Sequence, residues 1–244
     1  MEVTPTMDNR KSNRDKQQPD SVIMALDVGT SSVRGSLFST SGELLFINQI
    51  TTPPIFSSGG IVEQDPEVWQ HAVLENMKAS AAEAAAKRLR VEAIAVSAFR
   101  SPVFPVTEEG APLYNANMWQ DRRSSEYLPG VRHAEQAVFQ KTGLRISPVF
   151  SGLKISWFQN TFPDLCRKAY KFVGVYEYVL YLLTGKFITD HSVASRSNLF
   201  NIHSLEWDRE LLDLFQVSED KLAEPVRQAA VCGGLTYAAG RSAG

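Results

Sequence analysis

The stretch that most limits what this chain can fold into is IMALDVGTSSVRGSLF, residues 23–38. An apolar run ends at Asp27, small and hydroxylated residues fill positions 29–32, and a second apolar alternation follows around Arg34. Two strands joined by such a turn predict a β-hairpin. The hairpin has two interpretations. In one, the Asp and Gly only serve turn geometry. In the other, amides and hydroxyls of the turn bind phosphate while the acid faces its metal ion.

The elements that follow the hairpin predict an α/β fold. A third strand is expected over residues 42–50, and a loop rich in Pro, Gly and Ser over residues 51–60. A long helix should begin at Pro66 with Asp65 as its N-cap, because apolar residues then recur at helical spacing. Residues 91–99 then predict a buried strand. Strands that alternate with helices in this way favour an α/β architecture.

The second half of the chain is predicted to be more helical. Residues 103–114 indicate a hairpin that turns on Glu109 and Gly110. Helices are expected over residues 125–143, 151–169, 172–186 and 201–215.

Composition excludes several classes of protein. The chain has 244 residues with a net charge of -2, so no basic field attracts nucleic acid or an anionic membrane surface. No apolar run reaches the ~20 residues of a membrane span. Residues 1–20 lack the apolar core of a signal peptide and are predicted to be a disordered leader. Cys166 and Cys232 lie far apart in the sequence and are interpreted as reduced thiols of a cytoplasmic protein. The histidines show no metal-binding spacing.

Five blocks of the sequence carry a resemblance to a known family. They are ALDVGTSSVR, GGIVEQDPEVW, YNANMWQDRRS, SGLKISWF and ASRSNLFNIHSLEWD. In this order and spacing the chain resembles the N-terminal domain of the FGGY carbohydrate kinases, and is most similar to the glycerol kinases. The resemblance runs from Ile23 to Thr236. It implies an actin-like ATPase (ribonuclease H-like) domain over residues 21–244, with a mixed sheet flanked by helices, and it implies that the second domain of the family is absent from these residues.

The family resemblance also implies an activity and its site. The activity would be ATP-dependent phosphorylation of a hydroxyl on a small sugar or polyol, with ATP and Mg²⁺ as cofactors. The metal would be held by Asp27, and the substrate would contact Arg100, Ser101 and Trp119. The phosphates would be bound by Gly29, Thr30, Ser31, Ser32 and Arg34.

Two positions depart from the glycerol kinase pattern. Ser101 stands where glycerol kinases have a glutamate, and Val149 stands where they have a tyrosine. Both changes remove hydrogen-bonding partners for substrate hydroxyls, so glycerol is not expected to be the preferred substrate. A larger sugar such as a ketopentose, a polyol or a short linear sugar fits as well.

The family's general base is an aspartate in a Gly-x-x-x-Asp segment, which is expected beyond Gly244. No catalytic residue is therefore assigned within the chain, and the chain by itself is expected to be inactive. One alternative is a binding or regulatory module that kept the kinase fold without catalysis. Another actin-like ATPase is disfavoured by the YNANMWQDRRS and SGLKISWF blocks. Their Arg122 and Arg123 are expected to form structural ion pairs, and Lys154 and Trp157 to serve packing and helix capping. The sequence leaves homo-oligomerisation open.

Overall fold

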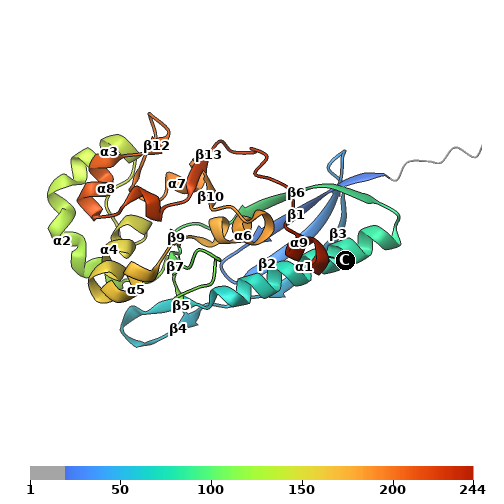
Figure 1. Cartoon of the computed structure of the whole chain (residues 1–244), viewed down its shortest axis with the longest axis horizontal. Helices are drawn as coiled ribbons and strands as arrows, with labels where there is room; N and C mark the ends of the chain where they lie inside the picture. The colour runs from blue at the N-terminus through green and yellow to red at the C-terminus, as the bar shows by residue number, and fades with distance from the viewer. Residues whose placement is uncertain (1–19, 244) are drawn as a thin grey trace, which may run out of the picture.

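A computed structural model describes residues 20–243 of the chain, so the predicted leader lies outside it except for Asp20. Figure 1 shows an elongated molecule in which a sheet with one long helix occupies one end and a group of short helices the other. Each end has its own apolar core.

The main sheet has four strands in the order β3-β2-β1-β6. Strand β2 is antiparallel to both β1 and β3, whereas β6 runs parallel to β1. The sheet is therefore mixed, as predicted, and the three-strand start of the chain is confirmed. The bounds of the strands are β1 (Ser21–Val28), β2 (Ser32–Ser39), β3 (Leu44–Thr51) and β6 (Arg90–Ala98).

The long helix α1 (Pro66–Ala86) packs on one face of this sheet. It begins as predicted, with Pro66 in its first turn and the Asp65 carboxylate accepting a hydrogen bond from the Glu67 amide at 2.9 Å. The cap satisfies one of the amides that a helix N-terminus leaves without a partner. Alternate residues of β1 are buried against this side of the sheet, which is the period-two pattern of a strand covered on one face.

A buried asparagine joins α1 to β2. The Asn76 side-chain oxygen accepts a hydrogen bond from the Gly35 amide at 3.0 Å, and its nitrogen donates to the carbonyl oxygens of Val33 and Ala72. The helix can approach this closely because Gly35 has no side chain: a Cβ atom there would lie 2.8 Å from Cβ of Asn76. Gly35 thus sets the distance between helix and sheet.

The strand predicted to be buried over residues 91–99 is present as β6, but the prediction of burial is wrong. Its residues alternate between exposed and half-buried. The reason is its position: β6 is the last strand of the sheet order, and only one of its sides is paired among the described residues. Its half-buried residues, among them Ile94 and Val96, pack against the core beside α1.

Short strands connect the sheet to the helical end of the molecule. The predicted loop over residues 51–60 contains β4 and a 3₁₀ turn, Ser58–Gly60. The predicted turn at Glu109 and Gly110 is confirmed by a hydrogen bond from the Thr107 amide to the Ala111 carbonyl, although β7 pairs mainly with the distant β9. The remaining strands are β4 (Ile55–Phe56), β5 (Val62–Gln64), β7 (Phe104–Val106), β8 (Ala116–Asn117), β9 (Lys171–Val173), β10 (Ile188–Asp190), β11 (Phe200–Asn201), β12 (Glu206–Trp207) and β13 (Glu224–Val226).

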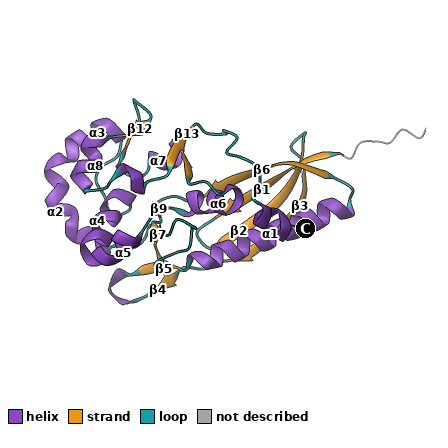
Figure 2. Cartoon of the chain, in the orientation of Figure 1, coloured by secondary structure: helices purple, strands orange, loops and turns teal. Residues whose placement is uncertain are grey.

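The later helices are shorter than predicted (Figure 2). Pro163 divides the helix expected over residues 151–169, because proline has no amide to continue the ladder. The segments 172–186 and 201–215 each begin with strand residues before their helix starts. The helices are α2 (Leu128–Val131), α3 (Glu135–Thr142), α4 (Ser151–Thr161), α5 (Pro163–Lys168), α6 (Val175–Thr184), α7 (His191–Ala194), α8 (Arg209–Phe215) and α9 (Tyr237–Ala243), with 3₁₀ turns at Arg123–Tyr127, Arg132–Ala134 and Glu219–Lys221.

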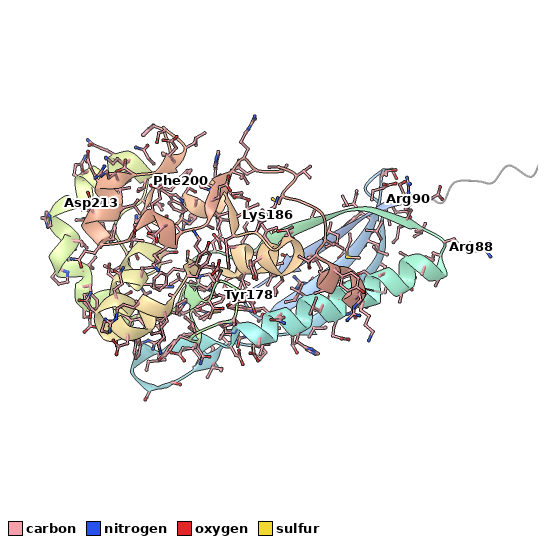
Figure 3. The ribbon with its side chains drawn as sticks, viewed as in Figure 1. Arg88, Arg90, Tyr178, Lys186, Phe200 and Asp213 are labelled. Carbon is pink, nitrogen blue, oxygen red and sulfur yellow. The ribbon has the colours of Figure 1, made fainter. Side chains whose placement is uncertain are left out.

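Helix α6 packs against α1 and β6 and lies near the middle of the molecule. Its Tyr178, labelled in Figure 3, is fully buried, and its hydroxyl donates a hydrogen bond to the Gln70 side chain of α1 at 2.8 Å. The core around the sheet therefore extends into the helix that follows β9. Over residues 20–243, no helix combines the length and apolar composition that crossing a bilayer requires.

We expect Gly35→Ala to lower the free energy of unfolding by about 1–3 kcal/mol, because the new methyl group overpacks the contact with Asn76. Gly130→Ala in α2 is the matched control, since its Cβ would meet nothing within 4 Å. The control should be neutral or stabilising by up to about 1 kcal/mol. Urea denaturation of both variants measures the difference, and equal stabilities would contradict the close packing at Gly35.

Candidate functional site

A cavity of about 500 Å³ lies where β1 and β6 end. Five residues predicted from the sequence line it: Asp27, Gly29, Arg100, Ser101 and Trp119. Asp27 and Trp119 are 92 positions apart along the chain, and the fold brings all five residues to one place. The cavity has the size of a site for a small molecule.

The parallel pairing of β1 and β6 explains why these residues meet. Asp27 is paired with Ser97 in the register of the two strands, so both strands end at the same edge of the sheet. The Phe99 amide continues the pairing with a hydrogen bond to the Val28 carbonyl at 2.9 Å. Arg100 and Ser101 therefore leave the sheet beside Asp27. Ligands of open α/β sheets bind at this carboxyl edge of parallel strands.

The turn of the first hairpin is less open than the sequence suggested. The Gly29 amide is not free, because it donates a hydrogen bond to the Ser32 carbonyl at 2.8 Å and closes the turn. Ser32 itself is buried at the start of β2. The amides and hydroxyls of Thr30 and Ser31 have no hydrogen-bonding partner among the described residues. Thr30 and Ser31 are thus the turn residues that offer free donors outside the buried start of β2.

Asp27 and Arg34 contact each other across the hairpin. Arg34 Nη1 lies 3.1 Å from Asp27 Oδ2, and Arg34 Nε donates to the Gln49 side-chain oxygen at 2.8 Å. About half of each charged side chain remains exposed, 40% for Arg34 and 51% for Asp27. Asp27 Oδ1 has no hydrogen-bonding partner within residues 20–243. Thr30, Ser31, Ser32 and Arg34 do not line the cavity itself.

Ser101 has a strained backbone at the edge of the cavity. Its φ is +79°, in the left-handed region that residues with a side chain rarely adopt. Such a conformation persists only where its surroundings hold it, and it is common at functional sites. Ser101 is also 8% exposed, so its carbonyl oxygen is held inside the protein.

The side chain of Lys154 holds this strained segment. Its Nζ donates hydrogen bonds to the carbonyl oxygens of Ser101 and Met118, both at 2.7 Å, and of Asn117 at 3.3 Å. Lys154 comes from α4, so one buried amine joins the segment after β6 to the segment before Trp119. Lys154 is fully buried, as its predicted packing role requires, but the predicted capping role is wrong, because the amine binds carbonyls outside its own helix.

Burial lowers the pKa of Lys154 to about 7, and the charge of Asp121 opposes this shift. Three carbonyl acceptors match the three donors of an ammonium group, so the geometry favours the charged form. The K-x-x-W spacing of Lys154 and Trp157 was visible in the sequence. Its role was not, because the carbonyls that it binds are distant in the chain.

Trp119 projects into the cavity from a segment whose flanks are buried. Its side chain is 41% exposed, whereas Met118 and Asp121 are almost fully buried. Arg123 anchors the segment through ion pairs to Asp121 at 2.9 Å and Glu63 at 2.7 Å. Burial lowers the pKa of Arg123, but the hydrogen bonds and charges of these acids raise it above its ordinary value.

The structural ion pair predicted for Arg123 is therefore confirmed. Its guanidinium also lies 4.5 Å from the ring of Trp157, which is packed in the core as predicted. For Arg122, the structure records no ion pair within residues 20–243. The flat exposed face of Trp119 can pack on the carbon skeleton of a ligand.

Arg196 lines the same cavity and was missed by sequence reasoning. It follows the short helix α7, where its amide donates to the Val193 carbonyl, and its guanidinium lies 4.7 Å from the ring of Phe150. The signal that could have found it is its place in ASRSNLFNIHSLEWD, one of the five blocks that carry the family resemblance. Val149, the predicted apolar departure, also lines the cavity.

A small cavity of about 40 Å³ adjoins the site and shares Arg100, Ser101 and Arg196 with it. Its buried acid, Glu177, accepts hydrogen bonds from the Thr189 hydroxyl at 2.6 Å and the Gly174 amide at 3.0 Å. Burial raises the pKa of Glu177. This carboxyl group is thus engaged by its own neighbours.

We expect Lys154→Met to lower the free energy of unfolding by on the order of 3 kcal/mol, because it removes three buried hydrogen bonds and leaves the Ser101 carbonyl oxygen without a partner among the described residues. It should also release the strained backbone at Ser101 and so reduce ligand binding in the cavity. Lys78→Met is the control, since Lys78 is exposed on α1. Chemical denaturation of the two variants tests the prediction. A Lys154 variant as stable as its control would show that the three hydrogen bonds make no net contribution to the free energy of unfolding.

Comparison with known proteins places this geometry in a family. A model of the N-terminal domain of the FGGY family of carbohydrate kinases matches residues 22–244. A glycerol kinase of Mycoplasmoides gallisepticum is 38% identical over 220 residues, which cover 86% of this chain and 43% of that protein. Glycerol kinase 2 of Saccharolobus solfataricus is 37% identical over 92% of this chain and 46% of its own length. The chain thus spans less than half the length of these relatives.

Solved structures agree with the fold. The crystal structure of Plasmodium falciparum glycerol kinase with ADP superposes with a TM-score of 0.85 at 22% identity, over 91% of this chain and 46% of that one. A gluconate kinase from Lactobacillus acidophilus gives a TM-score of 0.84 at 24% identity, over 92% of this chain and 45% of that one. The fold is that of the actin-like kinases, with the N-terminal domain present. From the match over residues 22–244 and the identity to these relatives, the chain belongs to the FGGY family of carbohydrate kinases.

Proposed function

We propose that this chain is the substrate- and phosphate-binding half of an ATP-dependent kinase that phosphorylates a hydroxyl of a small sugar or polyol. The observation that carries the proposal is the cavity in which Asp27 and Gly29 face Arg100, Ser101 and Trp119. An acid beside a hydroxyl-rich turn suits a metal-bound phosphate, and an arginine beside an exposed tryptophan suits a hydroxylated carbon chain.

The residues present fit a magnesium nucleotide. Among residues 20–243, no cluster of three or more acidic, histidine or cysteine side chains could hold a metal by itself. Mg²⁺ bound to a nucleotide does not need one, because it keeps several waters and takes one or two carboxylates together with phosphate oxygens. Asp27 is such a carboxylate, and its Oδ1 has no hydrogen-bonding partner within the described part of the chain. Bound ATP would supply the phosphoryl group.

The chain's own residues would bind and position the reactants. Within residues 20–243 the amides and hydroxyls of Thr30 and Ser31 have no partner, so they could donate to phosphate oxygens. Arg34 would orient Asp27 through their contact at 3.1 Å and add positive charge near the phosphates. Arg100, Ser101 and Trp119 would hold the sugar. The proton of the attacking hydroxyl would go to a base outside these residues, so we expect this chain to bind ligands without turning them over.

We expect Asp27→Asn to abolish metal-dependent nucleotide binding at the hairpin, because the amide keeps the shape of the side chain and loses its charge. The measurement uses Mn²⁺ with ATP as a paramagnetic probe. In the wild-type chain, Mn²⁺ with ATP should broaden the NMR signals of the amides in residues 29–32. In the variant the broadening should disappear while the melting temperature changes little.

Glu43→Gln is the matched control, because Glu43 is an exposed acid in the turn between β2 and β3. It should leave the broadening intact. If Asp27→Asn lowers the melting temperature by several degrees and leaves the broadening unchanged, Asp27 is a turn residue and the phosphate site is elsewhere.

We also expect glycerol to bind more weakly than longer polyols and ketoses, because Ser101 and Val149 lack the groups that the glycerol kinase pattern supplies. The double variant with Ser101→Glu and Val149→Tyr gains two hydrogen-bonding groups. It should bind glycerol about 10- to 100-fold more tightly. Calorimetric titration of both proteins with glycerol, ribitol and xylulose measures this. Glycerol as the tightest ligand of the wild-type chain would refute the expectation.

A further inference from the structure

The cavity at the ends of β1 and β6 has an unusual charge balance. Its lining contains three residues with formal charges: Asp27, Arg100 and Arg196. Asp27 is already in contact with Arg34 at 3.1 Å, so its charge is shared with an arginine outside the lining. The remaining charges on the cavity wall are the two guanidinium groups. The wall that faces a ligand is therefore positive.

Neither arginine has an acidic partner in the described part of the chain. The structure records no ion pair or side-chain hydrogen bond for Arg100 or Arg196 over residues 20–243. Arg196 lies instead over the face of Phe150, at 4.7 Å. Burial lowers the pKa of Arg196, and the positive charge of Arg100 lowers it further. Both guanidinium groups belong to the lining of one cavity, where their like charges repel each other.

The residue next to Arg100 does not reduce this imbalance. It is Ser101, whose side chain carries no charge. Ser101 cannot neutralise a cation, and Glu177 in the adjoining cavity is engaged by Thr189 and Gly174. Two arginines that repel each other and lack an acid are stabilised by a bound anion. A guanidinium group matches a planar carboxylate with two parallel hydrogen bonds.

The rest of the wall indicates what carries the anion. Trp119, 41% exposed, offers a flat face to a carbon chain, and Val149 adds an apolar patch. A cavity of about 500 Å³ accommodates a sugar-sized molecule with a charged end. On the basis of the proposed function, we propose that the substrate is a sugar acid, a polyhydroxylated chain whose carboxylate is bound by Arg100 and Arg196.

One other role for the two arginines fits the same charge balance. They could neutralise the phosphoryl group during transfer, because Asp27 and Gly29 line the same cavity. The two roles differ in what they predict for binding without nucleotide. A carboxylate site selects an acid over the matching neutral polyol. A phosphoryl site binds inorganic phosphate and shows no such selection.

The experiment is a calorimetric titration of this chain, without nucleotide or metal, with two matched pairs of ligands. The pairs are gluconate with glucitol and glycerate with glycerol, and inorganic phosphate is titrated separately. We expect at least one acid to bind about 10- to 100-fold more tightly than its neutral match, which is the effect of a charge-assisted contact. Arg196→Gln and Arg100→Gln should each remove most of this preference. The preference should also weaken as salt is added.

Arg132→Gln is the control, because Arg132 is exposed and lines neither cavity. It should keep the full preference for the acid, and circular dichroism should show all variants folded. If the neutral polyols bind as tightly as the acids or more tightly, the sugar-acid proposal is wrong while the kinase proposal stands. If phosphate alone binds and depends on Arg196, the arginines serve the phosphoryl group. If no ligand binds, the sugar site is refuted and the proposed function with it.

Discussion

The parallel pairing of β1 with β6 is the constraint on which the site depends. Parallel strands require a long connection, and here α1 makes it by crossing one face of the sheet. Because both strands end at the same edge, the acid at the end of β1 lies beside the loop that carries Arg100 and Ser101. The contact between Asn76 and Gly35 then holds α1 against β2. The cavity is thus a consequence of strand direction and helix packing together.

A second interaction connects the sheet to the helical end of the molecule. Lys154 extends from α4 and binds carbonyl oxygens of the two segments that form the cavity wall. Burying an amine is unfavourable unless its donors are satisfied, and here three carbonyls satisfy them. The strained backbone of Ser101 and the outward position of Trp119 both rely on this residue. The two apolar cores are therefore joined at the place where a ligand would bind.

Much of the fold was predictable because its signals are local. The first hairpin, the third strand and the start of α1 at Asp65 and Pro66 follow from turn residues, alternation and capping. The failures have physical reasons. β6 is half exposed because burial depends on how many neighbours a strand has, and no local pattern gives that number. Pro163 shortened one helix, while the partners of β7 and β9 were too far apart in the chain to be paired from sequence.

The sequence by itself determined the family and identified five of the eleven residues that line the cavity. Asp27, Gly29 and Trp119 stand in blocks whose order and spacing identify them, and Arg100 and Ser101 follow the strand predicted over residues 91–99. The tertiary structure alone decided which donors are free and which charges are paired. The Gly29 amide closes its own turn, Lys154 binds distant carbonyls, and Arg196 and Arg100 share a cavity in which neither has an acidic partner among the described residues. Hydrogen bonds and charge balance depend on distances between residues remote in the chain, and these distances exist only in the folded molecule.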